Sequence, residues 1–167
     1  MKKHDSMRGW FAYELYYQMK KNKNIWLIVG DLGYKVFDSH FKDFPKRTIN
    51  AGAAEQSMIG ISVGLALENK IPFCYSITPF LLYRPFETIR NYLNHEKIPV
   101  KLIGSGRNKD YKHDGFSHWA EEDIFIPKLI PNIECFWPSK KEQISSIMEE
   151  IINNNNPVYL NLRRCKK

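Results

Sequence analysis

The segment AGAAEQSMIG (51–60) places one carboxylate, Glu55, among alanines and glycines at the predicted start of a buried helix. Burying a charged carboxylate without a partner is costly, so we expect Glu55 to pair with a group of this chain or of a second molecule. A desolvated carboxyl group can share a proton with a nearby ring nitrogen and so act in acid–base chemistry. The alternative is that Glu55 only caps its helix, where the macrodipole favours negative charge.

Other side chains able to do chemistry follow predicted strands. Asp31 ends a short apolar strand, and it either lines a ligand site or simply forms a turn. A polar loop after the strand predicted at 98–105 carries Asp114 and His118. The same loop carries His113, which as a lone histidine among polar residues is more often just solvated.

Three aromatic residues, Phe80, Tyr83 and Phe86, recur at helical spacing after the strand predicted at 71–77. Such rings can hold a flat heterocycle by stacking. The same spacing is also typical of ordinary core aromatics, so both interpretations stay open at this point.

The elements that must position these residues alternate between apolar runs and helical patterns. Strands are predicted at 24–31, 47–50, 71–77, 98–105, 132–138 and 157–162, and helices at 7–20, 53–69, 84–96, 119–130 and 139–154. Pro85 suits the first turn of the third helix, and Ser139 can cap the last. The alternation predicts an α/β fold, with a mostly parallel β-sheet and helices on both faces, formed by one domain over 1–167. Ligands of such sheets gather beyond the carboxyl ends of the strands, where the candidate residues fall.

Composition narrows the class of protein. No apolar run approaches the roughly 20 residues that span a bilayer, and none follows the charged N-terminus as in a signal peptide, so a cytoplasmic protein is expected. The formal net charge is +7, but the lysines are spread out, and nucleic-acid binding rests on that charge alone. Cys74, Cys135 and Cys165 lack metal-ligand spacing, so neither a zinc site nor a disulfide is expected.

Five segments, in order, resemble the pyrimidine-binding domain of transketolase-type, thiamine diphosphate-dependent enzymes: INAGAAEQSMIGISVGLALENKIPF, RPFETIRN, KLIGSG, HDGFSHWAEEDI and IPNIECFWPSKKEQ. The resemblance runs from about Asp31 to Arg163. In that family, the glutamate matching Glu55 hydrogen-bonds a ring nitrogen of the cofactor's aminopyrimidine and promotes the imino tautomer. The cofactor does the carbon–carbon chemistry, while the protein orients and tunes it.

The resemblance implies further cofactor-binding residues. Asp31 matches an aspartate that ends the first strand near the cofactor. Phe80, Tyr83 and Phe86 match three aromatic positions that enclose the pyrimidine ring. With Glu55, these residues form the expected half-site for thiamine diphosphate.

The resemblance also implies a substrate side. Asp114 and His118 match residues that contact sugar hydroxyls or help proton transfer, and His113 is a further candidate for substrate contact. Phe116 stands where the family usually has a proline. Because its side chain is bulky, the substrate is expected to differ from the common pentose and hexose phosphates.

The chain contains no segment resembling the family's diphosphate-binding domain or its C-terminal domain. The resemblance therefore implies a split transketolase in which a separate diphosphate-binding subunit supplies the Mg²⁺ ligands and much of the sugar pocket, in an α2β2 assembly. Arg84 and Arg90 match a region near a subunit interface. The small-residue helix after Glu55 is a second expected contact surface.

The implied activity is the transfer of a two-carbon ketol unit between sugars or sugar phosphates. Three alternatives stay open: a decarboxylating synthase or lyase acting on a 2-oxo acid, a catalytically silent subunit, and a nucleic-acid-binding protein. Asp114 and His118 favour a polyol substrate. The retention of Glu55 within its motif argues against the silent subunit.

Overall fold

The structure, a computed structural model, describes Met1 and residues 4–164. Cys165 and parts of the two basic ends, at 2–3 and 165–167, lie outside the described residues. Across the described part of the chain, no helix combines the length and the apolar character that a membrane crossing requires.

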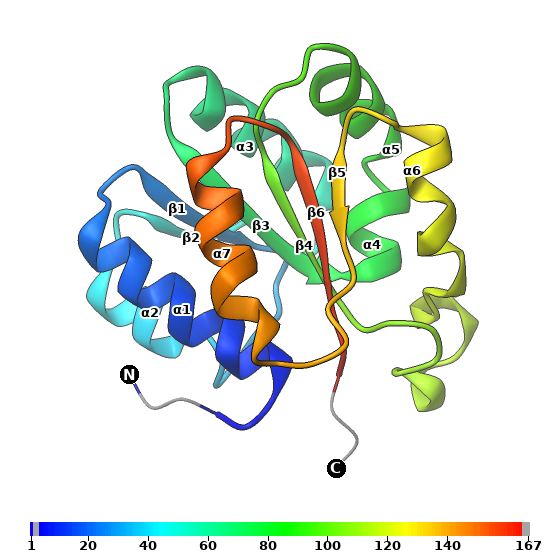
Figure 1. Cartoon of the computed structure of the whole chain (residues 1–167), viewed down its shortest axis with the longest axis horizontal. Coiled ribbons are helices and arrows are strands. Elements are labelled where there is room, and N and C mark those ends of the chain that lie inside the picture. The colour runs from blue at the N-terminus through cyan, green and yellow to red at the C-terminus, as the bar shows by residue number, and fades with distance from the viewer. Residues whose placement is uncertain (2–3, 165–167) are drawn as a thin grey trace.

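Six parallel strands form one sheet in the order β2-β1-β3-β4-β6-β5 (Figure 1). In chain order they are Ile25–Val29 (β1), Thr48–Asn50 (β2), Ile71–Ile77 (β3), Lys101–Ser105 (β4), Glu134–Phe136 (β5) and Val158–Leu162 (β6). The central strands β3, β4 and β6 are buried along nearly their whole length, which is why they read as near-continuous apolar runs. The predicted α/β fold is confirmed.

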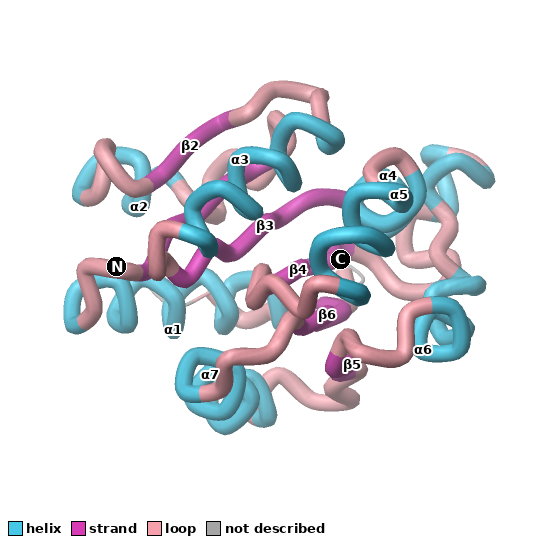
Figure 2. Tube along the Cα trace, turned by 90° about the horizontal axis from the view of Figure 1, so that it is seen from above, coloured by secondary structure: helices cyan, strands magenta, loops and turns pink. Residues whose placement is uncertain are grey.

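Helices cover both faces of the sheet (Figure 2). One face carries α1 (Met7–Lys21) and α7 (Gln143–Asn153), which pack side by side. The other face carries α3 (Glu55–Leu67), α4 (Thr78–Tyr83) and α5 (Phe86–Thr88). Two short helices, α2 (Asp38–Asp43) and α6 (Ile126–Leu129), lie toward the β2 and β5 edges of the sheet.

Each face of the sheet has its own apolar core. Phe11 of α1 packs in one core and Met58 of α3 in the other. Neighbouring residues of β1, Leu27 and Ile28, enter opposite cores because successive strand side chains point to opposite faces. The sheet therefore lies between two packed cores, and its carboxyl ends can position a site.

The helix predicted at 84–96 is present over residues 86–95, but an unpredicted helix, α4, precedes it. Helical backbone begins at Thr78, is interrupted at Arg84 and Pro85, and resumes as α5, which runs into a π-helix over Ile89–His95. Pro85 has no backbone N–H to donate into the preceding turn, so α4 cannot run on unbroken. Arg84 therefore sits at a break between two helices rather than inside one.

Two further helix predictions are wrong in detail. The segment predicted as a helix at 119–130 forms a 3₁₀ helix at Glu121–Phe125 followed by α6, and within it the buried Asp123 side chain accepts hydrogen bonds from Tyr159 and Asn161. Ser139 is not the cap of the last helix, which begins at Gln143. Instead, Oε1 of Gln143 accepts hydrogen bonds from the backbone N–H of Ser139, at 2.8 Å, and from its hydroxyl, at 3.1 Å.

Candidate functional site

The carboxylate of Glu55 is buried where the carboxyl ends of β1 and β3 meet the start of α3. Its side chain is only 2 % exposed. The hydroxyl of Ser76, near the end of β3, donates to Oε1 of Glu55 at 3.3 Å. Gly30 follows β1, and a Cβ there would lie 3.2 Å from Oγ of Ser76 and 3.5 Å from Oε1 of Glu55. The glycine therefore leaves room for this pair.

The turn before α3 delivers Glu55 to that position. Gly52 has φ +72°, which glycine adopts at no steric cost, and its N–H donates to Oδ1 of Asn50 at 2.9 Å. Glu55 then begins α3, so the positive end of the helix macrodipole faces its carboxylate. The helix end therefore contributes to holding this buried charge, although the cap position itself is Ala54 and no side chain makes a capping hydrogen bond there.

Arg84 supplies the ionic partner of Glu55. Its Nη1 lies 2.7 Å from Oε2 of Glu55, and its side chain is 47 % exposed. The guanidinium carbon also lies over the ring of Phe80, 3.9 Å from the ring centroid. The sequence predicts an interface role for Arg84, whereas the structure gives it a partner within the chain.

Phe80 joins this pair to the loop that follows β4. The rings of Phe80 and His118 meet edge to face with centroids 4.8 Å apart. Tyr111 lies 6.1 Å from His118 between ring centroids, and Oγ of Ser117 lies 3.0 Å from Nδ1 of His118. The structure therefore brings Glu55, Phe80 and His118 together through Arg84 and direct ring contact.

The other predicted substrate residues lie on the same loop. Asp114 lies 3.8 Å from Nη1 of Arg164, whose guanidinium covers the ring of Tyr111 at 4.6 Å. His113 and Asp114 are both exposed on a 3₁₀ turn, Lys112–Asp114. These two residues thus face solvent beside the site rather than its buried carboxylate.

Asp31 lies at an exposed turn just after β1. It has φ +52°, and its Oδ1 accepts hydrogen bonds from the hydroxyl of Tyr34 at 2.7 Å and from Nδ2 of Asn50 at 3.1 Å. These two hydrogen bonds hold the pKa of Asp31 below its usual range. The turn that it forms is the simpler of the two interpretations drawn from the sequence, and it lies one residue beyond the Gly30 that faces Glu55.

The two remaining predicted aromatics differ from Phe80. Tyr83 is 43 % exposed, with its hydroxyl 3.5 Å from a carboxylate oxygen of Glu122, and partial burial raises its pKa to about 12. Phe86 packs against the core under α3 and α4. Phe80 is thus placed against Arg84 and His118, whereas Phe86 is partly buried against the core.

A buried polar network anchors the loop that carries His118, and sequence reasoning did not predict it. Oδ2 of Asp123 accepts hydrogen bonds from Tyr159 at 2.7 Å, Asn161 at 2.8 Å and Nε1 of Trp137 at 3.0 Å. Burial raises the pKa of Asp123. Arg107 also donates to Asn161, from Nε to Oδ1 at 2.9 Å. A usable signal was Asn161 itself, a polar residue inside the apolar strand VYLNL.

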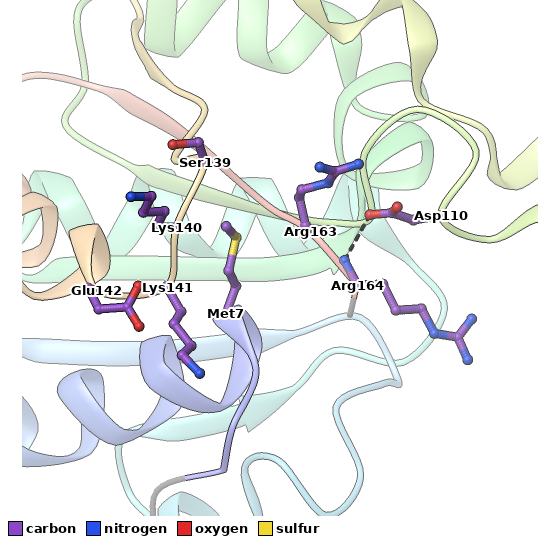
Figure 3. A pocket seen from close by; sticks show the side chains of 8 residues that line it. All are labelled: Met7, Asp110, Ser139, Lys140, Lys141, Glu142, Arg163 and Arg164. Atoms are coloured by element: carbon purple, nitrogen blue, oxygen red, sulfur yellow. Dashed lines mark hydrogen bonds between the residues drawn. The ribbon is translucent and has the colours of Figure 1, made fainter. Parts of the chain in front are cut away.

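A separate cavity of about 580 Å³ opens near the end of β6 (Figure 3). It is lined by Met7, Asp110, the turn 139–142, Arg163 and Arg164. The backbone N–H of Arg164 donates to Oδ2 of Asp110 at 2.8 Å. Figure 3 shows the side chains of Arg163 and Arg164 pointing away from each other, so they do not converge on one anion.

Comparison with known proteins places these features in context. Residues 5–166 match the family described as "Transketolase, pyrimidine binding domain". A subunit of an apulose-4-phosphate transketolase from Actinobacillus succinogenes is 34 % identical over 121 residues, covering 72 % of this chain and 39 % of the relative. A 6-deoxy-6-sulfo-D-fructose transketolase subunit from a Clostridium species is 32 % identical, covering 74 % of this chain and 38 % of the relative.

A solved structure described as "Split gene transketolase, inactive beta4 tetramer" superposes with a TM-score of 0.83 at 31 % identity. The match covers 95 % of this chain and 51 % of that chain. The chain therefore spans about half or less of the length of the relatives that it matches.

Proposed function

This chain belongs to the family of transketolase pyrimidine-binding domains, and from that premise we propose that it is one subunit of a split transketolase. In this proposal it supplies the aminopyrimidine half of a thiamine diphosphate site and moves a two-carbon ketol unit between sugars only with a partner subunit. The observation that carries the proposal is the buried carboxylate of Glu55, which accepts from Ser76 and pairs with the Arg84 guanidinium that lies over Phe80.

The residues present fit an aminopyrimidine. Glu55 offers a buried acceptor at a helix start, and Phe80 offers a ring against which a flat group stacks. In support of this fit, the planar guanidinium of Arg84 contacts both Glu55 and Phe80. Thiamine diphosphate, when bound, supplies the carbon nucleophile of the reaction. Glu55 holds or releases the proton shared with the pyrimidine nitrogen, and Ser76 orients the carboxylate from Oε1.

His118 and Asp114 form the substrate side of the proposed site. His118 is held against Phe80, so its ring is within reach of a group bound over that residue. A histidine there can orient a sugar hydroxyl or move a proton to it. Phe116, which is 84 % exposed on the same loop, would then contact the substrate and set which sugar fits.

The partner subunit would bind the diphosphate through Mg²⁺ and complete the sugar pocket in an α2β2 assembly. Among the described residues, no group of three or more His, Cys, Asp or Glu side chains is placed to hold a metal ion. Two relatives are named for a phosphorylated and a sulfonated sugar. We therefore propose that the substrate is a small ketose that carries an anionic group. We also propose that Asp31 and Tyr83 lie at the margin of the cofactor site.

Calorimetric titration of thiamine diphosphate with Mg²⁺ tests the proposal. We expect no tight binding to this chain alone and tight binding when a diphosphate-binding transketolase subunit of the same source is added. Tight binding to the isolated chain would refute the split site. Absence of binding in the mixture, with both subunits folded, would favour a catalytically silent subunit.

The Glu55→Gln variant separates catalysis from assembly. Glutamine keeps the size of the side chain but cannot hold the shared proton, so the rate of the assembled enzyme should fall about 10²–10⁴-fold. The matched control is Glu68→Gln, because Glu68 is exposed at the end of the same helix. Gln56 is unsuitable as a control position because its side chain hydrogen-bonds Thr88. Equal rates for Glu55→Gln and Glu68→Gln would refute the assigned role.

A further inference from the structure

We propose that Arg84 occupies the aminopyrimidine position in the isolated subunit and must leave it before the cofactor can bind. The inference rests on the proposed cofactor site and names a residue that competes with the cofactor for it. Two contacts carry it: Nη1 of Arg84 lies 2.7 Å from Oε2 of Glu55, and the guanidinium carbon lies over the ring of Phe80, 3.9 Å from its centroid.

The guanidinium imitates the ring that the site is proposed to hold. It is planar and presents N–H donors at its edge, as an aminopyrimidine presents its amino group and a protonated ring nitrogen. The guanidinium carbon of Arg84 lies over the ring of Phe80, and its Nη1 donates a hydrogen bond to Oε2 of Glu55. Both interactions that would recognise the pyrimidine are thus already made by one side chain.

Among the described residues, both carboxylate oxygens of Glu55 already have hydrogen-bond donors, and only the Arg84 side of the carboxylate is close to solvent. Its side chain is 2 % exposed, Oε1 accepts from the hydroxyl of Ser76, and Oε2 accepts from Arg84. Ser76 is itself fully buried, whereas Arg84 is half-exposed. A ligand that arrives from solvent therefore meets Arg84 first and displaces it.

Arg84 is placed where it can move. It lies at the break between α4 and α5, immediately before Pro85, and its long side chain reaches Glu55 from the solvent side. Because the Arg84 half of the ion pair is solvated, a ligand that makes the same two contacts with Glu55 and Phe80 can replace it without leaving the buried carboxylate unpaired. The apparent affinity is then reduced by the fraction of chains in which Arg84 covers the site.

Removing the side chain should therefore tighten binding to the isolated chain. The probe is the neutral hydroxymethyl-aminopyrimidine half of thiamine, which lacks both the diphosphate and the thiazolium charge. For Arg84→Leu we expect an affinity about five-fold or more above that of the wild type. Arg90→Leu is the matched control, because Arg90 is exposed and hydrogen-bonds its neighbour Asn91, so its affinity should equal that of the wild type.

A second measurement uses the unaltered chain. The ring of Phe80 should shift the Nε–H and Cδ protons of Arg84 upfield in NMR spectra, and Phe80→Leu should abolish that shift. Saturating aminopyrimidine should return the Arg84 signals to the positions of a solvated arginine. An unchanged Arg84 signal in the saturated complex would overturn the proposal.

The outcomes separate this inference from the proposed function. If the two-subunit mixture binds thiamine diphosphate in a Glu55-dependent manner but Arg84→Leu binds the probe no more tightly than the wild type, Arg84 does not compete for the site. If the mixture does not bind thiamine diphosphate and no variant binds the aminopyrimidine probe, the proposed cofactor site is wrong. The proposed competition by Arg84 is then wrong as well.

Discussion

The imidazole of His118 meets the ring of Phe80 edge to face, with the two ring centroids 4.8 Å apart. Phe80 belongs to α4, whereas His118 belongs to the loop that follows β4. The same Phe80 ring lies under the guanidinium of Arg84, which pairs with Glu55. One aromatic ring thus connects the proposed cofactor and substrate sides of the site.

A double-mutant cycle of Phe80→Leu and His118→Ala should measure this contact. Aromatic pairs contribute about 0.5–1.5 kcal/mol beyond the area they bury, so we expect a coupling energy of that size in urea unfolding of the isolated chain. The cycle of Phe80→Leu with His113→Ala is the control, because His113 is exposed on the neighbouring turn. Additive changes in the first cycle would show that the rings do not stabilise each other.

The buried carboxylate of Asp123 should be one of the most sensitive positions for stability. Asp123→Ala leaves the donors of Tyr159, Asn161 and Trp137 without their shared acceptor, so we expect a loss of about 3 kcal/mol or more in the free energy of unfolding. The measurement is urea denaturation followed by tryptophan fluorescence and circular dichroism.

Two further variants test the explanation for Asp123. Asp123→Asn keeps one acceptor oxygen and should lose less stability than Asp123→Ala. Glu121→Ala removes an exposed carboxylate that pairs with Lys109 at 3.4 Å, and it should change stability by about 0.5 kcal/mol at most. A loss for Glu121→Ala equal to that for Asp123→Ala would point to a local helix effect instead.

Much of the fold follows from sequence pattern because parallel strands buried on both faces are continuous apolar runs. IPFCYSI and KLIGS read as strands for this reason, and both are central strands of the sheet. Pro85 marked the helix start near Arg84 to within two residues, whereas the break near Asp123 was missed because its inward-turning carboxylate is a tertiary feature. Hydrogen bonds between residues far apart in the sequence, such as those of Asp123 with Tyr159 and Asn161, produce no periodic pattern from which they could be predicted.

The candidate site was only partly accessible from the sequence. The buried position of Glu55 follows from its small neighbours, and the contact between Phe80 and His118 agrees with their placement beyond adjacent strand ends. The sequence does not predict which residue pairs with Glu55. Arg84 is 29 positions away, and it reaches Glu55 from the break between α4 and α5. Asp31 shows the converse, since its sequence context fits a site but its contacts are those of a turn.

Acid should destabilise the chain through His40. Burial among the rings of Tyr16, Phe37 and Phe44 lowers its pKa from 6.5 to about 4, although Asp43 acts in the opposite direction. The unfolded chain therefore binds a proton at a higher pH than the folded chain does. Stability from this group is complete above pH 6.5 and is lost as the pH falls toward 4, by at most about 3 kcal/mol.

The variant His40→Leu should flatten the dependence of unfolding free energy on pH between 6.5 and 4. His95→Leu is the control, because His95 is exposed at the end of the π-helix and its loss should leave the slope of the wild type unchanged. Chemical denaturation at several pH values gives these slopes. The explanation fails if His40→Leu keeps the full acid sensitivity.

Two glycines should respond to alanine in opposite directions. A Cβ at Gly104 in β4 would lie 2.7 Å from Oγ1 of Thr78 and 3.0 Å from the ring of Tyr159, so Gly104→Ala should lose about 1–3 kcal/mol. A Cβ at Gly64 in α3 meets no heavy atom within 4 Å among the described residues. Because alanine is the better helix former, Gly64→Ala should stabilise the isolated chain by about 0.5–1 kcal/mol.

The same Gly64→Ala variant tests whether α3 contacts the partner subunit. Gly64 is exposed in the isolated chain, and the exposed side of this helix also carries Ile61 and Leu67, which a second subunit would cover. If it does, the added methyl group should weaken assembly while the isolated chain becomes more stable. Sedimentation velocity of the two-subunit mixture measures the first effect, and thermal unfolding of the isolated chain measures the second. Unimpaired assembly of Gly64→Ala, with the expected gain in stability, would place the subunit contact elsewhere on the molecule.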